Sequence, residues 1–224
     1  MLTKSKLIAP QRTTPPLAGK VQNQKNQHNY KLQSKDYTLG RWPFLFGRKT
    51  IVDKLPIDRD AKATILEIGC GTGQMLKHVA QKYPNSRLFG IDMSSQMIKK
   101  SQSRMARFSD RVTLIQAPYQ KNLNYPFNQV DGIIFSYSLS MINPQWEDLV
   151  NRAWEDLRPG GWIAVVDFHN SGFSSFKKHM SKHHVRMDGH LLRYLRDHFL
   201  IHQETVKSAF AGAWSYFLFI GKKL

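Results

Sequence analysis

The stretch LEIGCGTG, residues 66–73, has three glycines at alternate positions directly after a short run of β-branched and apolar residues. Glycine lacks a Cβ, so it can adopt the left-handed backbone of a tight turn and lets a ligand approach the main chain. The spacing is G-x-G-x-G, whereas a pyrophosphate-binding dinucleotide site has G-x-G-x-x-G. We therefore expect a strand, a ligand-binding turn and a helix, with a ligand other than a dinucleotide.

Strand and helix patterns alternate after this turn. Short apolar runs predict strands at 63–68, 87–92, 111–117, 130–136 and 160–168, and apolar residues with a helical period predict helices at 73–83, from Ser94 onward and at 145–157. The inward stripe expected for the last helix is Trp146, Leu149, Val150, Ala153, Trp154 and Leu157. This alternation predicts a parallel sheet covered on both faces, with ligands at the carboxyl ends of the strands.

Two acidic residues flank the glycine turn. Asp92 ends the second predicted strand, where its carboxylate can accept two hydrogen bonds from a ribose diol, and Glu67 places a second carboxylate beside the loop. Two carboxylates disfavour a phosphate but suit an ammonium or a sulfonium. We therefore expect a cofactor with a ribose and a positive charge but no phosphate. Cys70 is interpreted as a small loop residue, because no neighbour would activate its thiol.

With these features the chain resembles the class I S-adenosylmethionine-dependent methyltransferases from about Thr64 to the C-terminus. The resemblance implies a Rossmann-like α/β fold: a seven-stranded, mostly parallel sheet with an antiparallel last strand and helices on both faces. The run FLIHQETVKSAFAGAWSYFLFIGKK, residues 199–223, supplies the last two strands with no helix between them. The implied cofactor is S-adenosylmethionine.

The resemblance also implies which residues bind that cofactor. In the family the glycine loop holds the methionine part, the acid matching Asp92 binds the ribose hydroxyls, and the residue matching Met93 lies against adenine. Gln116 and Ala117 match positions at the adenine edge, although the family often has Asp in place of Gln116. The main chain of Ser136 matches the position that holds the methionine amine. The implied cofactor-binding residues are Glu67, Gly69, Cys70, Gly71, Gly73, Asp92, Met93, Gln116, Ala117 and Ser136.

Three stretches carry a narrower resemblance, to the betaine-lipid N-methyltransferases. They are RWPFLFGRK at 41–49, YSLSMI at 137–142 and VVDFHNSGFSSFKKHMSKHHVRMDGHLL at 165–192. That family methylates the amine of diacylglyceryl-homoserine three times to give diacylglyceryl-trimethylhomoserine, so the resemblance implies a lipid acceptor. Nucleic-acid amino-methyltransferases of this fold usually have Asn or Asp, two prolines and an aromatic after strand four, to hold a flipped base. Here that place reads SYSLSM, so no nucleic-acid substrate is expected.

The segment SKHHVRMDGH, residues 181–190, contains three histidines and two cations. A zinc site is disfavoured, because the histidines lack helical i, i+4 spacing and cysteine partners, and no metal is expected. For a homoserine lipid, Arg186 would bind the carboxylate at two points and His169 or His184 would take a proton from the amine. His169 could equally be a satisfied histidine at a strand end. Asp188 is expected to cap a helix that turns Leu191, Leu192, Leu195 and Phe199 inward.

Aromatic rings attract the quaternary ammonium that a third methyl transfer would produce. Tyr137, after the fourth predicted strand, is the first candidate for such a wall, and Tyr37 is the second. Structural packing would explain both residues as well. The expected catalytic residues are thus Tyr137, His169, His184, Arg186 and Tyr37.

Composition and charge indicate the partners and the location of the protein. The net charge is +17, and residues 1–35 contain seven Lys or Arg and no Asp or Glu, which favours an anionic partner. We expect a flexible basic arm at 1–35, an aromatic lid or membrane-contacting segment at 36–62 and a catalytic domain at 63–224. No apolar run reaches the length of a spanning helix. The expected location is cytoplasmic, peripheral on the inner face of the membrane.

Three alternatives stay open from the sequence. A phosphatidylethanolamine N-methyltransferase would share the membrane, and a quinone-type methyltransferase would share the apolar substrate. A basic nucleic-acid-binding protein with a methyltransferase fold would instead use the positive charge, with affinity that falls steeply as salt rises.

Overall fold

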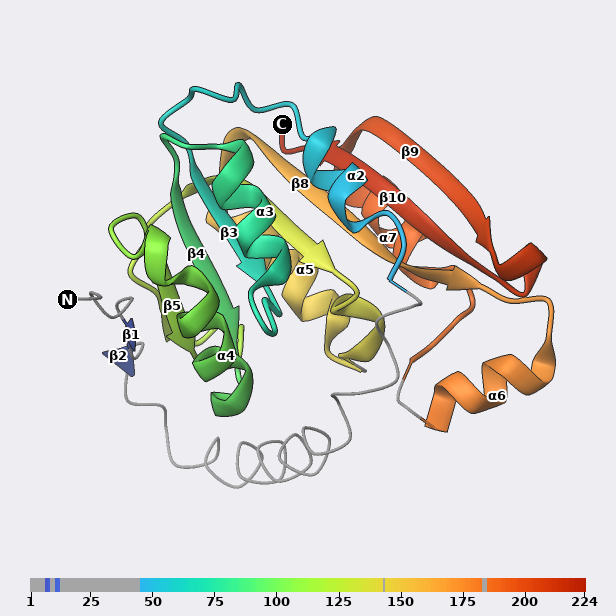
Figure 1. The fold of residues 1–224 in the computed structure, drawn as a ribbon. Helices are drawn as coiled ribbons and strands as arrows, with labels where there is room; N and C mark the ends of the chain where they lie inside the picture. Colours follow the sequence, from blue (N-terminus) through green and yellow to red (C-terminus); the bar gives the residue numbers. More distant parts are fainter. Residues whose placement is uncertain (1–6, 9–10, 13–44, 143, 183–184) are drawn as a thin grey trace.

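The computed structural model describes residues 7–8, 11–12, 45–142, 144–182 and 185–224 (Figure 1). Two predicted site residues, Tyr37 and His184, lie outside the described residues. So do most of the predicted arm at 1–35 and residues 36–44 of the predicted lid.

A single large sheet orders the molecule, with strands in the order β1-β5-β4-β3-β7-β8-β10-β9 (Figure 1). Neighbouring strands are parallel except that β10 is antiparallel to both β8 and β9, which confirms the predicted mostly parallel sheet with an antiparallel last strand. The two-residue strand β1, from the predicted arm, adds an eighth strand beside β5. The strands are β1 (Leu7–Ile8), β3 (Thr64–Ile68), β4 (Arg87–Asp92), β5 (Val112–Gln116), β7 (Val130–Ser136), β8 (Leu157–Asn170), β9 (Leu200–Ala209) and β10 (Trp214–Lys222). The short strands β2 (Gln11–Arg12) and β6 (Leu123–Asn124) form a separate antiparallel pair.

Helices cover both faces of the large sheet, as predicted. Helices α2 (Arg48–Asp53), α3 (Gln74–Lys82) and α4 (Ser95–Met105) contribute to one buried apolar cluster, and α5 (Trp146–Asp156) and α7 (His190–His198) contribute to the other. Figure 1 shows α3 and α4 in front of the sheet and α6 (Ser174–Lys182) set apart from the body. The short 3-10 helices are η2 (Ala106–Phe108), η3 (Leu139–Met141) and η4 (Phe210–Gly212).

The ends and the buried face of three helices can be compared with the sequence predictions. The side chain of Ser94 accepts a hydrogen bond from the N–H of Met97 and caps α4, as predicted. Trp154, predicted to face inward, is instead 41% exposed, because it lies at the edge of the apolar stripe of α5 and its ring contacts the ammonium of Lys223. Helix α7 begins one residue later than expected: Gly189 is the N-cap, and the Asp188 carboxylate accepts from the N–H of His190.

The described end of the predicted lid is part of the core. Ile51 and Val52 on α2 are fully buried, and Leu55 joins the same apolar cluster. Residues 51–55 therefore belong to the same core as the sheet and its helices. No helix in the described part of the chain combines the length and apolarity required to cross a bilayer.

Candidate functional site

A cavity of about 190 Å³ opens at the carboxyl ends of β3, β4, β5 and β7. This is the edge of a parallel sheet where ligands are expected. The cavity brings together half of the predicted cofactor-binding residues: Gly69, Gly71, Asp92, Met93 and Ala117. The other lining residues are Ile68, Ile91, Ser94, Met97, Pro118, Tyr119, Tyr137, Ser138, Met141, Ile142 and Leu149.

The glycine turn has the backbone that its sequence predicts. Gly69, Gly71 and Gly73 all have positive φ, between 54° and 73°, a region that costs other residues free energy. A Cβ on Gly69 would stand 2.7 Å from the Cβ of Ser138, whereas a Cβ on Gly71 would have no atom within 4 Å. The turn is thus tight at Gly69 and open to a ligand at Gly71.

Asp92 links the turn to the next strand. Its Oδ2 accepts a hydrogen bond from the N–H of Gly71 at 2.9 Å, and its Oδ1 accepts one from the N–H of Ser94 at 2.9 Å. Burial raises the pKa of Asp92, while the two N–H donors act in the opposite direction. Each carboxylate oxygen has a second lone pair, so this fixed side chain at the cavity wall can still accept hydrogen bonds from a diol.

Glu67 differs from its predicted role. It is fully buried on β3, and burial raises its pKa to about 8, against the opposing attraction of Arg48. Glu67 is therefore mostly neutral at pH 7, so it does not supply the fixed negative charge that the sequence suggested beside the loop. Arg48 itself reaches the end of β7, where its Nε donates to the Oγ of Ser136 at 2.9 Å.

Four other predicted cofactor residues do not line the cavity. The buried thiol of Cys70 points toward Gly90, and burial raises its pKa well above the ordinary value, as suits a small structural residue. Gly73 precedes α3, where a Cβ would collide with Ser101. Gln116 is exposed at the end of β5. Ser136 ends β7, where its hydroxyl accepts a hydrogen bond from Arg48, and its expected main-chain contact with the methionine amine stays a prediction.

Tyr137 lines the cavity directly after β7 and has an unusual backbone. Its φ is 55°, and its hydroxyl donates to the carbonyl of Phe46 at 2.9 Å. Its ring lies 4.8 Å from the ring of Phe168, and burial raises the pKa of the phenol well above its usual range. A positive φ at a non-glycine residue costs free energy, so the surrounding structure must hold Tyr137 in this conformation.

The structure does not bring His169 and Arg186 to the cavity wall. The His169 ring lies against Gly189 and Phe217, on the face of the sheet that α7 covers, and burial lowers its pKa. The Nε of Arg186 donates to Asp188 at 2.6 Å, and the side chain is largely exposed. Their expected roles as proton acceptor and carboxylate clamp have no support from this arrangement.

Sequence reasoning missed a buried acid next to the cavity. Asp167 on β8 is fully buried, and it accepts hydrogen bonds from the N–H groups of Ser140 at 3.1 Å and Phe168 at 2.8 Å. Burial raises its pKa to about 6. Asp167 thereby holds the loop after β7, which carries the lining residues Met141 and Ile142. The only signal in the sequence is an acid inside the apolar run at 163–168.

The histidine-rich segment also contains an unexpected pair. His190 Nδ1 hydrogen-bonds to Asp188, and its ring packs edge-on against Trp146 at 4.8 Å. Burial lowers the pKa of His190 despite the carboxylate. Among the described residues, which exclude 183 and 184, no three His, Cys, Asp or Glu side chains gather in a way that would hold a metal ion.

Comparison with known proteins agrees with this geometry. Residues 65–161 match the family model described as "Methyltransferase domain". The malonyl-[acyl-carrier protein] O-methyltransferase 2 of Ilyobacter polytropus is 28% identical over 126 residues, which cover 54% of this chain and 46% of that protein. The chain spans about half the length, or less, of the curated relatives that it matches.

Solved structures share the fold over more of the chain. The 1,6-didemethyltoxoflavin-N1-methyltransferase of Burkholderia thailandensis superposes with a TM-score of 0.69 at 16% identity, covering 96% of this chain and 94% of that one. The phosphoethanolamine N-methyltransferase 2 of Haemonchus contortus gives 0.65 at 15% identity, covering 81% of this chain and 53% of that one. Residues 65–161 thus match a methyltransferase domain, within a chain that has the Rossmann-like class I methyltransferase fold.

Proposed function

We propose that the chain is an S-adenosylmethionine-dependent N-methyltransferase whose cofactor binds in the cavity beside the glycine turn. The observation that carries the proposal is that Gly71, Asp92 and Tyr137 border the same cavity. Asp92 would accept hydrogen bonds from the ribose hydroxyls, and Met93 and Ala117 would flank the adenine. The open side of Gly71 would leave room for the methionine part, near the largely neutral Glu67.

The residues present fit a cofactor of this kind. None of the described residues that line the cavity is cationic, so this lining is poorly suited to a phosphate, while Asp92 offers acceptors for a diol. When bound, S-adenosylmethionine would supply an electrophilic methyl group on sulfur. The protein has to align the acceptor nitrogen with that methyl, exclude water and keep the amine unprotonated. The methyl would pass from sulfur to the nitrogen lone pair, and each of the first two transfers would also release one proton from the nitrogen to solvent, whereas the third would leave a quaternary ammonium with no proton to lose.

The acceptor that we propose is the amine of diacylglyceryl-homoserine, methylated three times to diacylglyceryl-trimethylhomoserine. Four residues of YSLSMI, one of the stretches that resembles the betaine-lipid enzymes, line the cavity: Tyr137, Ser138, Met141 and Ile142. The Tyr137 ring offers a face to a developing quaternary ammonium, an attraction of about 0.5 to 2 kcal/mol. Met141 and Ile142 provide apolar surface suited to a lipid-borne group.

A lipid acceptor requires a membrane partner, because withdrawing acyl chains from a bilayer costs about 0.8 kcal/mol for each CH₂ group. We propose that the protein works at the inner, anionic face of a membrane, to which its net charge of +17 would attract it. The basic residues within 1–35 and the aromatic residues at 42–44 remain candidates for this contact, and all of them except Arg12 on β2 lie outside the described residues.

Transfer to oxygen is the alternative with an observation in its favour, since the sequence relative from Ilyobacter is named an O-methyltransferase acting on a malonyl-[acyl-carrier protein]. An amine acceptor and a carboxyl acceptor give products that differ in chemical class. The reaction can therefore be assigned from the methylated product.

The test is mass spectrometry of lipids from cells that express this chain, with and without the aminocarboxypropyl transferase that would make diacylglyceryl-homoserine. The proposal predicts mono-, di- and trimethylated homoserine lipid only when both proteins are present. Purified protein with methyl-labelled cofactor should label the same lipid and leave malonyl-[acyl-carrier protein] unlabelled. Label in the carrier protein, in phosphatidylethanolamine or in a quinone would replace the proposed acceptor, and no label in any of them would refute methyl transfer to these substrates.

A further inference from the structure

An exposed aromatic surface lies at the tip of the β9–β10 hairpin. Phe173 is 58% exposed, Phe210 is 51% exposed and Phe46 is 40% exposed, and we call these three residues the aromatic tip. The ring centroids of Phe46 and Phe210 are 5.6 Å apart, and Phe46 also stacks on Tyr216. Large rings that gather at the surface typically mark a contact with another molecule or a membrane.

Hydrogen bonds hold the start of α6 against this hairpin. The hydroxyl of Ser171 donates to the carbonyl of Ala213 at 2.6 Å and accepts from the N–H of Phe173 at 3.1 Å. Ser171 is itself buried. Phe173 and α6 are therefore fixed beside the hairpin tip, as Figure 1 shows for the two segments.

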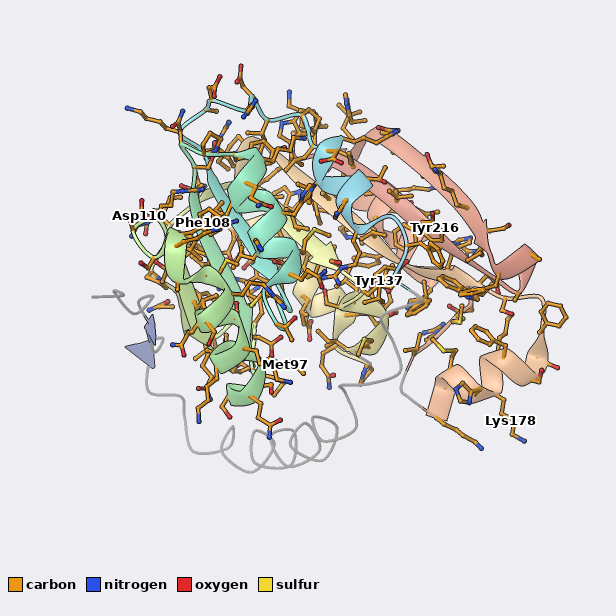
Figure 2. The ribbon with its side chains drawn as sticks, in the orientation of Figure 1. Met97, Phe108, Asp110, Tyr137, Lys178 and Tyr216 are labelled. Carbon is orange, nitrogen blue, oxygen red and sulfur yellow. The ribbon has the colours of Figure 1, made fainter. Side chains whose placement is uncertain are left out.

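Helix α6 adds positive charge next to the rings. Its Phe176 and Met180 pack against the apolar cluster of the domain, while Lys178 and Lys182 are exposed. Figure 2 shows Lys178 pointing away from the body of the molecule. Residues 171–187 contain no Asp or Glu, so the charge of this segment is uncompensated along the chain.

We propose that the aromatic tip and α6 form a docking surface for an anionic lipid bilayer. The three rings enter the interfacial region, where amphipathic surfaces bind, and Lys178 and Lys182 lie over anionic headgroups. A double-stranded nucleic acid would engage the cations through its phosphates and leave the three rings exposed, whereas a bilayer interface can bury them.

The docking surface rests on the proposed function, because it would bring the lipid acceptor to the proposed active site. The Phe46 carbonyl accepts the hydroxyl of Tyr137, which lines the cavity. The aromatic tip is therefore one residue away from the cavity wall. An acceptor lipid could keep its acyl chains in the bilayer under the tip while its headgroup reaches Tyr137.

The experiment measures binding of the full chain to vesicles of phosphatidylcholine and phosphatidylglycerol in equal parts, with phosphatidylcholine vesicles as the neutral reference. The test variants are Phe173→Ser with Phe210→Asn, and Lys178→Gln with Lys182→Gln. Asn is chosen at 210 because φ there is 48°, which Asn tolerates. Matched controls are Trp154→Ser, an exposed ring on α5, and Lys99→Gln with Lys100→Gln, exposed on α4.

The aromatic double variant should bind anionic vesicles at least tenfold more weakly than the wild type, since interfacial burial of each ring contributes substantially. The lysine pair should weaken binding by more than tenfold at low salt, at about fivefold for each charge, and both control variants should bind like the wild type. If the test and control variants bind anionic vesicles equally well, the proposed docking surface is refuted. It is also refuted if the wild-type protein does not bind anionic vesicles more tightly than neutral ones. Calorimetry of S-adenosylhomocysteine binding separates the two proposals. If the wild-type protein does not bind S-adenosylhomocysteine, the proposed cofactor site is refuted. If variants that no longer bind vesicles still bind S-adenosylhomocysteine, the docking surface is supported.

Discussion

At the scale of single residues, Asp92 has two tasks in one side chain. Its carboxylate accepts from the N–H groups of Gly71 and Ser94, and it borders the cavity in which we place the ribose. The same two oxygens thus shape the turn and, in the proposed complex, would also bind the ribose.

Replacing Asp92 by Asn should weaken S-adenosylhomocysteine binding by about ten- to a hundredfold, because hydrogen bonds to a charged group contribute about 1.5 to 3 kcal/mol. Isothermal titration calorimetry measures the change. Asp110→Asn is the matched control, since Asp110 is exposed and distant from the cavity (Figure 2). Wild-type affinity in Asp92→Asn would remove Asp92 from the site.

Tyr137 offers a second test at this scale. Tyr137→Phe removes the hydrogen bond to the Phe46 carbonyl and should lower the free energy of unfolding by about 1 kcal/mol. Urea unfolding monitored by fluorescence gives that number. Cofactor affinity should stay unchanged because the ring remains in the wall, whereas Tyr137→Leu should reduce turnover with the lipid acceptor. A Leu variant with full turnover would argue against the aromatic wall.

Residues whose role depends on local backbone could be predicted from the sequence. Gly69, Gly71 and Asp92 occupy a turn and a strand end that a few neighbours specify, and the structure places all three at the cavity. Arg48 and Asp167 were missed, because their contacts with Ser136 and Ser140 join positions 88 and 27 residues apart. No local sequence pattern predicts such long-range side-chain contacts.

At the scale of elements, the β3–α3 turn combines a crowded position with an open one. Gly69 and Gly71 both have positive φ, but only Gly69 faces a neighbour at short distance. Substitutions at the two positions therefore distinguish the free-energy cost of a left-handed backbone from the additional cost of a steric clash.

Gly71→Ala should cost roughly 1 to 2 kcal/mol of stability, from the left-handed backbone alone. Gly69→Ala should cost more, because its Cβ would stand 2.7 Å from the Cβ of Ser138. Thermal unfolding of the two variants side by side measures the difference. An equal loss in both would mean that the turn relaxes around the added methyl group.

Strand and helix positions were largely predictable, but the direction of side chains at their ends was not. His169 and Phe168 are neighbours at the end of β8, yet only Phe168 contacts Tyr137, because alternate side chains of a strand face opposite sides. The register that decides between them depends on where β8 pairs with β7 and β10. The sequence therefore predicts a histidine at the end of this strand but does not predict which face of the sheet its side chain occupies.

At the scale of the whole molecule, buried acids couple stability to pH. The pKa of Glu67 is raised from 4.5 to about 8 in the folded protein, and that of Asp167 is raised from 3.8 to about 6. The folded state therefore holds these protons at pH values where the unfolded chain has lost them. The free energy of unfolding falls as pH rises through each window, by up to roughly 1.4 kcal/mol for each pH unit and group.

Glu67→Gln should flatten this dependence between about pH 6.5 and about pH 8, where Glu67 is the one of the two acids still titrating. Urea unfolding at a series of pH values measures the slopes. Asp167→Asn serves as the comparison, because it should change the slope only below about pH 6. A wild-type slope that Glu67→Gln leaves intact would show that Glu67 is already ionised in the folded state.

The match to the methyltransferase family model ends at residue 161, before α6, α7 and the β9–β10 hairpin. The turn, Asp92 and Tyr137 lie within the matching part, whereas Phe173, Phe210 and the lysines of α6 lie beyond it. Substitutions in these later elements can therefore change how the proposed docking surface meets a membrane while leaving the glycine turn and Asp92 untouched.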